Sequence, residues 1–163
     1  MLAEGVFAVG AIDWDRRLFD SLIPLPDGTS YNSYLIKGSE KTVLIETVDI
    51  PMQDVLFNSL TELRITKLDY IIANHAEQDH SGSLPIIIRK YPDAKVVCSE
   101  KCKPMLIDLL KIPEERFLVV KDREVISLGD KTLEFIYTPW VHWPETMVTY
   151  LKEDKILFSC DFF

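Results

Sequence analysis

The order of apolar segments along the chain is the feature that most constrains its fold. Short segments rich in β-branched and aromatic residues come first, helical and extended patterns then alternate, and extended segments return at the end. This order favours an α+β fold in which helices cover a sheet. No glycine-rich loop joins a first strand to its helix, so a doubly wound nucleotide-binding fold is not expected. We predict strands over 6–12, 17–23, 30–36, 42–46, 68–73, 95–98, 117–120, 132–138, 146–151 and 155–159, and helices over 52–63, 83–90 and 99–110.

Composition limits the partners of the chain. Its 163 residues are about one domain's worth, and 18 basic against 26 acidic residues give a net charge of −8. This balance argues against nucleic acid and against anionic membrane surfaces as partners. No apolar run approaches the roughly 20 residues that a membrane-spanning helix needs, and the first residues do not resemble a secretion signal.

Three cysteines cannot all pair within the chain, so a reduced, cytoplasmic protein is the simpler expectation. Cys98 and Cys102 lack the second pair that a zinc ribbon or an iron–sulfur site would require. We expect Cys160 to lie in a strand and to pack inward.

The polar segment 74–83 carries four metal-competent side chains within six residues: His75, Glu77, Asp79 and His80. It follows a predicted buried strand and precedes a predicted helix, a position where binding sites are common. In an extended segment His75, Glu77 and Asp79 would point one way, and His80 the other way unless the chain turns. Two metal ions sharing one loop would suit this pattern, and a solvated polar turn is the alternative.

Two further segments contribute candidate ligands. His142, the last of only three histidines, lies between Trp140 and Trp143, which would give it an apolar surrounding. The alternative is an aromatic corner that packs the core. Asp161 follows a predicted buried strand, where a carboxylate is costly unless it is paired, metal-bound or solvated. Three imidazoles and three carboxylates suit iron or manganese as well as zinc, and a carboxylate can bridge two metals.

Four segments, 31–36, 75–85, 138–144 and 156–161, resemble the N-terminal metallo-β-lactamase-like domain of the flavodiiron proteins (A-type flavoproteins). They occur in the family's order and span nearly the whole chain. The resemblance implies that residues 1–163 are the N-terminal portion of a metallo-β-lactamase-like αββα sandwich, with no flavodoxin-like domain in this chain. Glu77 replaces the second histidine of the His-x-His-x-Asp-His loop of zinc hydrolases in the wider superfamily. A charged oxygen in place of a neutral nitrogen favours iron.

The resemblance also implies roles for the individual residues. One iron would be held by His75, Glu77 and His142. The other would be held by Asp79, with His80 as a further candidate, because in some family members water replaces the counterpart of His80. Asp161 would bridge the two irons. The family has one more histidine ligand downstream, and this chain has no histidine after His142. We therefore expect a second copy or another polypeptide to complete the domain.

The activity that the resemblance implies is reduction of dioxygen to water or of nitric oxide to nitrous oxide. Electrons would come from FMN on a flavodoxin-like partner, usually across a head-to-tail dimer and often supplied by a rubredoxin-like protein. Three alternatives remain open at this stage: a binuclear zinc hydrolase, against which Glu77 speaks; a di-iron protein that binds oxygen reversibly without flavin; and an inactive remnant of a longer protein.

Overall fold

A mixed sheet of six strands forms the centre of the protein. The computed structural model describes residues 1–162. The strand order is β1-β6-β7-β8-β9-β10, in which β7 to β10 run parallel and β1 and β6 complete the sheet in antiparallel fashion. The strands are β1 (Val6–Ala8), β6 (Tyr34–Lys37), β7 (Thr42–Ile45), β8 (Tyr70–Ala73), β9 (Lys95–Ser99) and β10 (Phe117–Val120). Because parallel strands end at the same edge, the residues after β7 and β8 are brought together.

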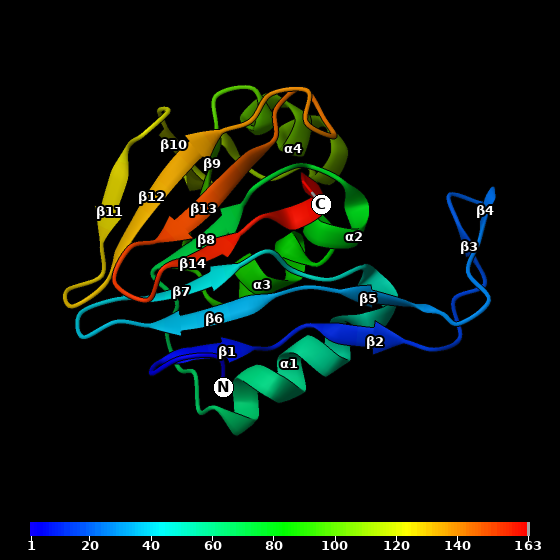
Figure 1. Ribbon diagram of the computed structural model, residues 1–163, viewed down its shortest axis with the longest axis horizontal. Coiled ribbons are helices and arrows are strands. Elements are labelled where there is room, and N and C mark those ends of the chain that lie inside the picture. Colours follow the sequence, from blue (N-terminus) through cyan, green and yellow to red (C-terminus); the bar gives the residue numbers. More distant parts are fainter. Residues whose placement is uncertain (163) are drawn as a thin grey trace.

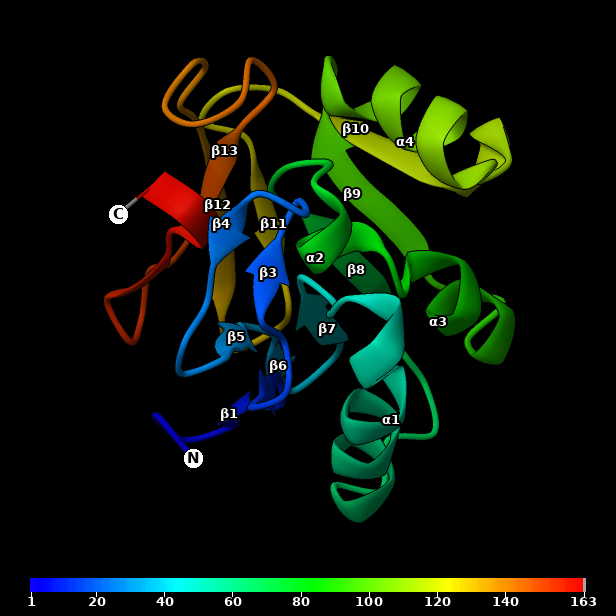
Figure 2. The same ribbon diagram turned by 90° about the vertical axis from the view of Figure 1, so that its right-hand side faces the viewer.

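A second, antiparallel sheet faces the first. It contains β11 (Val125–Ser127), β12 (Thr132–Tyr137), β13 (Met147–Leu151) and β14 (Ile156–Phe158) in that order. Helices cover the opposite side of the first sheet, so the layers run helix, sheet, sheet (Figure 2). The helices are α1 (Gln53–Glu62), α2 (Gln78–Ser81), α3 (Leu84–Lys90) and α4 (Cys102–Leu110), with short 3-10 turns η1 (Ile50–Met52), η2 (Glu114–Arg116) and η3 (Cys160–Phe162).

Alternation along the central strands divides the buried residues between two cores. Leu44 and Ile71 pack toward the helices, whereas Val43, Ile45 and Ile72 pack toward the second sheet. Successive side chains of a strand point to opposite faces, so a strand covered on both sides reads as a continuous apolar run. The predicted segments 42–46 and 68–73 have this pattern, which explains why the sequence identified them as strands.

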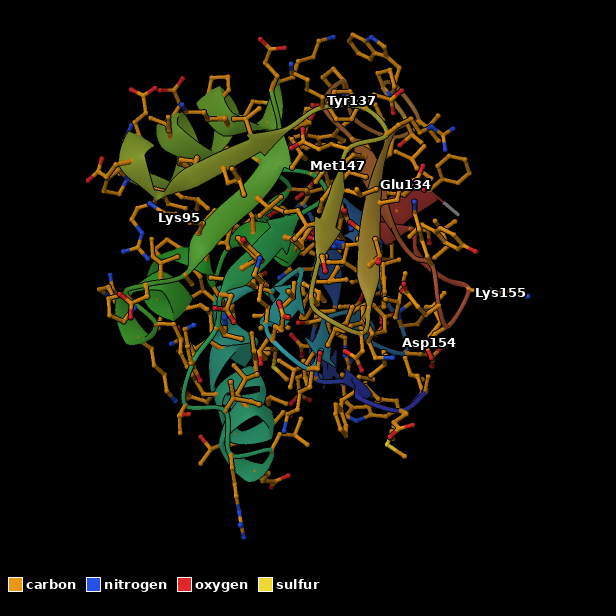
Figure 3. All side chains as sticks on the ribbon, turned by 90° about the vertical axis from the view of Figure 1, so that its left-hand side faces the viewer. Lys95, Glu134, Tyr137, Met147, Asp154 and Lys155 are labelled. Carbon is orange, nitrogen blue, oxygen red and sulfur yellow. The ribbon has the colours of Figure 1, made fainter. Side chains whose placement is uncertain are left out.

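The outer face of the second sheet carries both charged and apolar side chains. Glu134 on β12 lies 3.0 Å from Lys152 and 3.4 Å from Arg123 (Figure 3). Its neighbours in the same cross-strand row include Val125 and Leu157, which are 48% and 44% exposed. No helix covers this face within residues 1–162. Three of the four layers of an αββα sandwich are therefore present in the described part of the chain.

The prediction of a single strand over 17–23 is wrong. The structure has two short strands, β3 (Leu18–Phe19) and β4 (Ile23–Pro24), which pair with each other and project from the body (Figure 1). Asp20 and Ser21 connect them with positive φ angles of 48° and 58°. Aspartate and serine favour turns because their side chains bond to nearby backbone, and this preference overrides the apolar pattern.

Two other predicted strands are interrupted. Segments 6–12 and 30–36 each divide in two. The later part of the first, β2 (Ala11–Asp13), pairs with the earlier part of the second, β5 (Thr29–Tyr31), in a separate two-stranded sheet. Gly10 lies at the break, where a Cβ would stand 2.0 Å from the carbonyl oxygen of Tyr31. Only glycine allows so close an approach of backbone. The sequence did not predict β11 either, because its three residues are too few to establish a period.

Other expectations agree with the structure in part. The last long helix begins at Cys102, and the hydroxyl of Ser99 accepts a hydrogen bond from the Cys102 backbone N–H. Cys160 lies in η3 rather than in a strand and is half-buried. Among residues 1–162, no helix combines the length and apolar character needed to cross a bilayer.

The core between the two sheets should carry much of the stability. Phe135 on β12 is fully buried there. We expect Phe135→Ala to lower the free energy of unfolding by about 3–5 kcal/mol, since it removes a ring and leaves a cavity. Urea denaturation would measure the change. Leu109→Ala, at an exposed position of α4, is the control and should stay within about 0.5 kcal/mol; a comparable small loss for Phe135→Ala would contradict this packing.

Candidate metal centre

The segment that follows β8 is fixed by buried hydrogen bonds from both sheets. The backbone N–H of Asn74 donates to Glu46 Oε1 at 2.7 Å, and the N–H of Ala76 donates to Glu145 Oε1 at 3.0 Å. Thr149 Oγ1 donates to Asn74 Oδ1 at 2.7 Å. Because every one of these partners is buried, the loop is a rigid support for the side chains that it carries.

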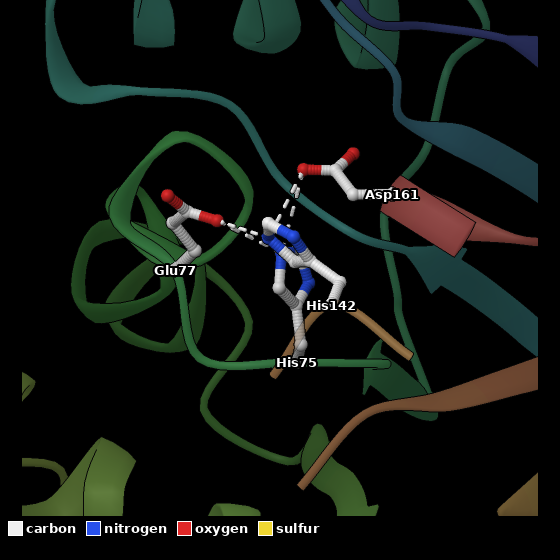
Figure 4. A group of neighbouring side chains, drawn as sticks. All are labelled: His75, Glu77, His142 and Asp161. Carbon is white, nitrogen blue, oxygen red and sulfur yellow. Dashed lines mark hydrogen bonds and ion pairs between the residues drawn. The ribbon is translucent and has the colours of Figure 1, made fainter. Parts of the chain in front are cut away.

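His75, Glu77, His142 and Asp161 form one group of potential ligands (Figure 4). Glu77 Oε2 lies 2.6 Å from His142 Nε2 and 3.6 Å from His75 Nε2. Asp161 Oδ2 lies 3.7 Å from each of the same two nitrogen atoms. Three separate segments of chain therefore direct their donor atoms to one point.

Asp79, His80 and Asp161 form a second group. His80 Nε2 lies 3.1 Å from Asp161 Oδ1 and 3.5 Å from Asp79 Oδ2. Asp161 thus faces the two groups with different oxygen atoms of one carboxylate: Oδ2 toward the first group and Oδ1 toward the second. That arrangement is the one a carboxylate adopts when it bridges two metals.

The placement of His80 depends on a turn that an extended segment would lack. Helix α2 begins at Gln78, which places His80 on the same side as His75. The centroids of the two imidazole rings lie 4.4 Å apart. The chain turns here, so His80 does not point away as it would in an extended segment. His75 is fully buried and His80 is 5% exposed, which also removes the solvated turn as a description of this loop.

The surroundings of His142 differ from the prediction in one respect. The Trp143 ring lies 6.2 Å from His142 and 6.3 Å from His75, whereas Trp140 is exposed. Only one of the two tryptophans therefore lines the site. Asp161 lies in η3, immediately beyond the strand β14, and its side chain is 37% exposed.

Charge in the group is balanced between carboxylates and imidazoles. Burial opposes protonation of His75, but Asp161, Glu77 and Glu46 outweigh it and raise the pKa of His75 to about 10. The pKa of His80 is likewise raised, since Asp161 and Glu46 outweigh its burial. The imidazoles of His75 and His80 beside Asp161 hold the pKa of its carboxyl group well below the usual range. Without a metal, protons on His75 and His80 therefore supply the positive charge.

The donor atoms fit divalent cations. Buried atoms without a hydrogen-bond partner among the described residues include His75 Nε2, Asp79 Oδ1, His80 Nδ1 and Glu46 Oε2. Unpaired buried polar atoms are costly and uncommon in proteins. Two divalent cations would satisfy His75 Nε2 and Asp79 Oδ1 and neutralise the carboxylates of the ligand groups. Glu46 Oε2 and His80 Nδ1 instead face each other at 3.7 Å.

Sequence reasoning missed two buried acids beside this cluster, Glu46 and Glu145. Glu46 follows β7, and its Oε2 lies 3.7 Å from His80 Nδ1. Thr47, the next residue, donates to the carbonyl oxygen of His80 from its backbone N–H and its hydroxyl. An acid directly after an apolar strand was the signal that identified Asp161, and the same signal was present at Glu46.

The fold and the cluster define a class of protein. Helices, a mixed sheet and a second sheet, with histidines and carboxylates gathered at the sheet edge, are the features of a metallo-β-lactamase-like metal-binding domain. The chain belongs to the ODP family of beta-lactamase-like proteins, whose family model matches residues 29–163. The predicted α+β fold and the predicted resemblance to flavodiiron proteins are both confirmed.

Relatives of known name agree with this assignment. The chain is 40% identical, over 99% of its length, to the type A flavoprotein of Rhodobacter capsulatus, of which it covers 38%. It is 37% identical to the nitric oxide reductase of Moorella thermoacetica, matching 99% of this chain and 41% of that protein. The crystal structure of the flavodiiron protein from Giardia intestinalis superimposes with a TM-score of 0.90 at 37% identity, covering 96% of this chain and 38% of that one. The chain thus spans about two fifths of the length of these relatives.

Metal binding should release protons. At pH 7 the metal-free His75 is protonated because its pKa is raised to about 10, and a metal ligates only the neutral imidazole. Affinity for a divalent cation should therefore rise with pH between 7 and 10. Calorimetric titration with Zn²⁺ at pH 7, in two buffers of different ionisation enthalpy, should show release of about one proton or more per chain. An observed heat that does not depend on the buffer would contradict the protonated state of His75.

Proposed function

We propose that this chain is the di-iron module of a flavodiiron-type oxidoreductase, which reduces dioxygen to water or nitric oxide to nitrous oxide. The observation that carries the proposal is the pair of ligand groups that share Asp161, one of which contains Glu77. In the proposed assignment, His75, Glu77 and His142 hold one iron, Asp79 and His80 hold the other, and Asp161 bridges them. When bound, the two irons would supply electrons in concert to one small substrate.

Glu77 is the main reason to prefer iron to zinc. Its carboxylate is a hard, charged donor, and the neighbouring imidazoles of His75 and His142 lower its pKa despite partial burial. It therefore stays ionised over the physiological range. An anionic oxygen in place of a neutral imidazole favours iron and its oxidised state. A zinc hydrolase, the competing proposal, would use a neutral nitrogen donor here.

The residues around the groups give the proposed site a closed side and an open side. His75 and His80 are buried against the strand ends, so they exclude water from behind the groups. His142 and Asp161 have side chains that are 32% and 37% exposed. A small gas molecule and an electron donor would therefore approach from the side of His142 and Asp161.

The remaining parts of the proposed reductase lie outside residues 1–163. We propose that FMN is carried on a flavodoxin-like domain or chain, and that a second copy of this chain or a complementing polypeptide brings it to the exposed side of the groups. A complementing polypeptide would supply a further histidine to the iron held by Asp79 and His80, because all three histidines of this chain are already assigned. A rubredoxin-like protein is the proposed electron donor. The relatives named nitric oxide reductase and coenzyme F420H(2) oxidase support redox chemistry of this kind.

Metal selectivity tests the role of Glu77. With Fe²⁺ alone, added anaerobically, we expect about two irons per chain. Because Zn²⁺ generally binds a given site more tightly than Fe²⁺, a second reconstitution in an equal mixture of the two metals sets the reference ratio of iron to zinc for the unchanged protein. Glu77→His restores the zinc-hydrolase pattern and should shift uptake toward zinc by about tenfold or more. Elemental analysis measures both. Preferential zinc uptake by the unchanged protein, together with hydrolysis of a thioester or lactam, would contradict the proposal.

Turnover provides the second test. With a reduced FMN-containing flavodoxin, the iron-loaded protein should consume dioxygen without releasing peroxide, or convert nitric oxide to nitrous oxide. An oxygen electrode and gas chromatography would follow the two reactions. Glu77→His serves as the matched control and should lose most of the activity. A stable oxygen-dependent absorbance without turnover would instead identify a reversible oxygen carrier.

A further inference from the structure

The buried carboxylate of Glu145 joins the two loops that bring Glu77 and His142 together. Glu145 follows His142 by three residues in the connection between β12 and β13, and it is 2% exposed. Its Oε1 accepts the backbone N–H of Ala76 at 3.0 Å. Ala76 is the residue between His75 and Glu77, so this hydrogen bond fixes the backbone between two members of the first ligand group.

Glu145 is itself held in place from the opposite side. The hydroxyl of Ser99, at the end of β9, donates to the backbone carbonyl oxygen of Glu145 at 2.8 Å. Thr146, the next residue, accepts the backbone N–H of Trp143 on Oγ1 and the backbone N–H of Thr138 on its carbonyl oxygen, each at 3.0 Å. The loop that carries His142 is therefore closed on itself and anchored to the first sheet.

The two sheets do not need Glu145 to stay together near the site. Met147 donates its backbone N–H to the carbonyl oxygen of Asn74 at 2.8 Å, and Thr149 Oγ1 bonds the Asn74 side chain at 2.7 Å. Both of these hydrogen bonds are to Asn74, which precedes His75, the first residue of the ligand groups. The bond from Glu145 to Ala76 acts between two ligands, and so bears directly on how Glu77 meets His142 at 2.6 Å.

Burying this carboxylate costs stability. Glu145 Oε2 is buried and has no hydrogen-bond partner among the described residues. A buried carboxylate oxygen without a partner is among the more costly arrangements in a protein interior. Departures from the rules of stable packing concentrate at functional sites, where the placement of a group matters more than its cost.

We propose that Glu145 is a positioning residue of the metal centre, which sets the separation of Glu77 and His142 by holding the backbone of Ala76. The inference rests on the metal centre of the proposed function. Glu145 does not itself bind the metal; it fixes the geometry in which the group of His75, Glu77, His142 and Asp161 binds. Loss of such supporting contacts commonly weakens metal binding by about 10- to 100-fold.

The test uses Co²⁺, whose visible absorption reports the ligands around it. Glu145→Met removes the acceptor while keeping an elongated side chain, and should weaken the affinity for Co²⁺ by about tenfold or more and alter the absorption. It should also reduce the rise in melting temperature that Co²⁺ produces, since a ligand stabilises only through its affinity for the folded state. Glu145→Gln keeps the acceptor for Ala76 and should bind Co²⁺ as the unchanged protein does.

Thr149→Val is the matched control, because it breaks a buried hydrogen bond between the same two parts of the structure. A purely structural bond should lower the melting temperature equally with and without Co²⁺ and leave the affinity within about twofold. Glu145→Asp, which keeps the charge but shortens the reach, should also weaken Co²⁺ binding and serves if Glu145→Met does not fold. Unchanged Co²⁺ affinity and absorption in Glu145→Met or in Glu145→Asp would overturn the inference. No uptake of Co²⁺ by the unchanged protein would overturn the metal centre as well.

Discussion

Negative charge gathered at one edge of the central sheet is the constraint on which the rest of the site depends. Glu46, Glu77, Asp79 and Asp161 all lie within one cluster, which is buried behind His75 and His80 and open to water on the side of His142 and Asp161. Burial raises the pKa of Glu46 and of Asp79. In the absence of a metal, protons on His75 and His80 balance the charge of the neighbouring carboxylates, which explains the raised pKa values of these two histidines. A divalent cation takes over the role of those protons, so protonation and metal binding are alternative ways of stabilising the same fold.

Both sheets are needed to build each half of the cluster. The end of β8 and the start of α2 supply His75, Glu77, Asp79 and His80, whereas His142 and Asp161 follow strands of the second sheet. Each ligand group therefore includes side chains from both sheets. The apolar core between the sheets holds these two sources in register. Metal affinity is thus a property of the packed fold, because an unfolded chain would hold the same residues far apart.

The residues of the two groups were predictable as candidates from the sequence because each follows a recognisable strand. Apolar runs identified β8 and β14, and the polar residues directly after them identified His75 and Asp161. The direction of His80 was not predictable, because it depends on a one-turn helix of four residues that has no periodic signal of its own. Glu145 was equally hidden, because its only side-chain bond within the described residues is to a backbone N–H 69 residues away.

Backbone strain is the feature that the sequence conceals most completely. Glu46, His142 and Cys160 all have positive φ angles, of 58°, 82° and 42°, and none of them is glycine. His142 belongs to the first ligand group, Glu46 lies beside His80, and Cys160 directly precedes Asp161. Side chains other than glycine adopt such angles only when the surrounding structure imposes them, at a cost of about 1–3 kcal/mol each. Among residues 1–162, seven other non-glycine residues also have positive φ angles, so such strain is not confined to the site. At the site it places His142 in the first ligand group, Glu46 against the backbone of Asn74, and Cys160 directly before Asp161. A cation bound by His142 would offset the cost at that position, so the fold and the metal centre stabilise each other.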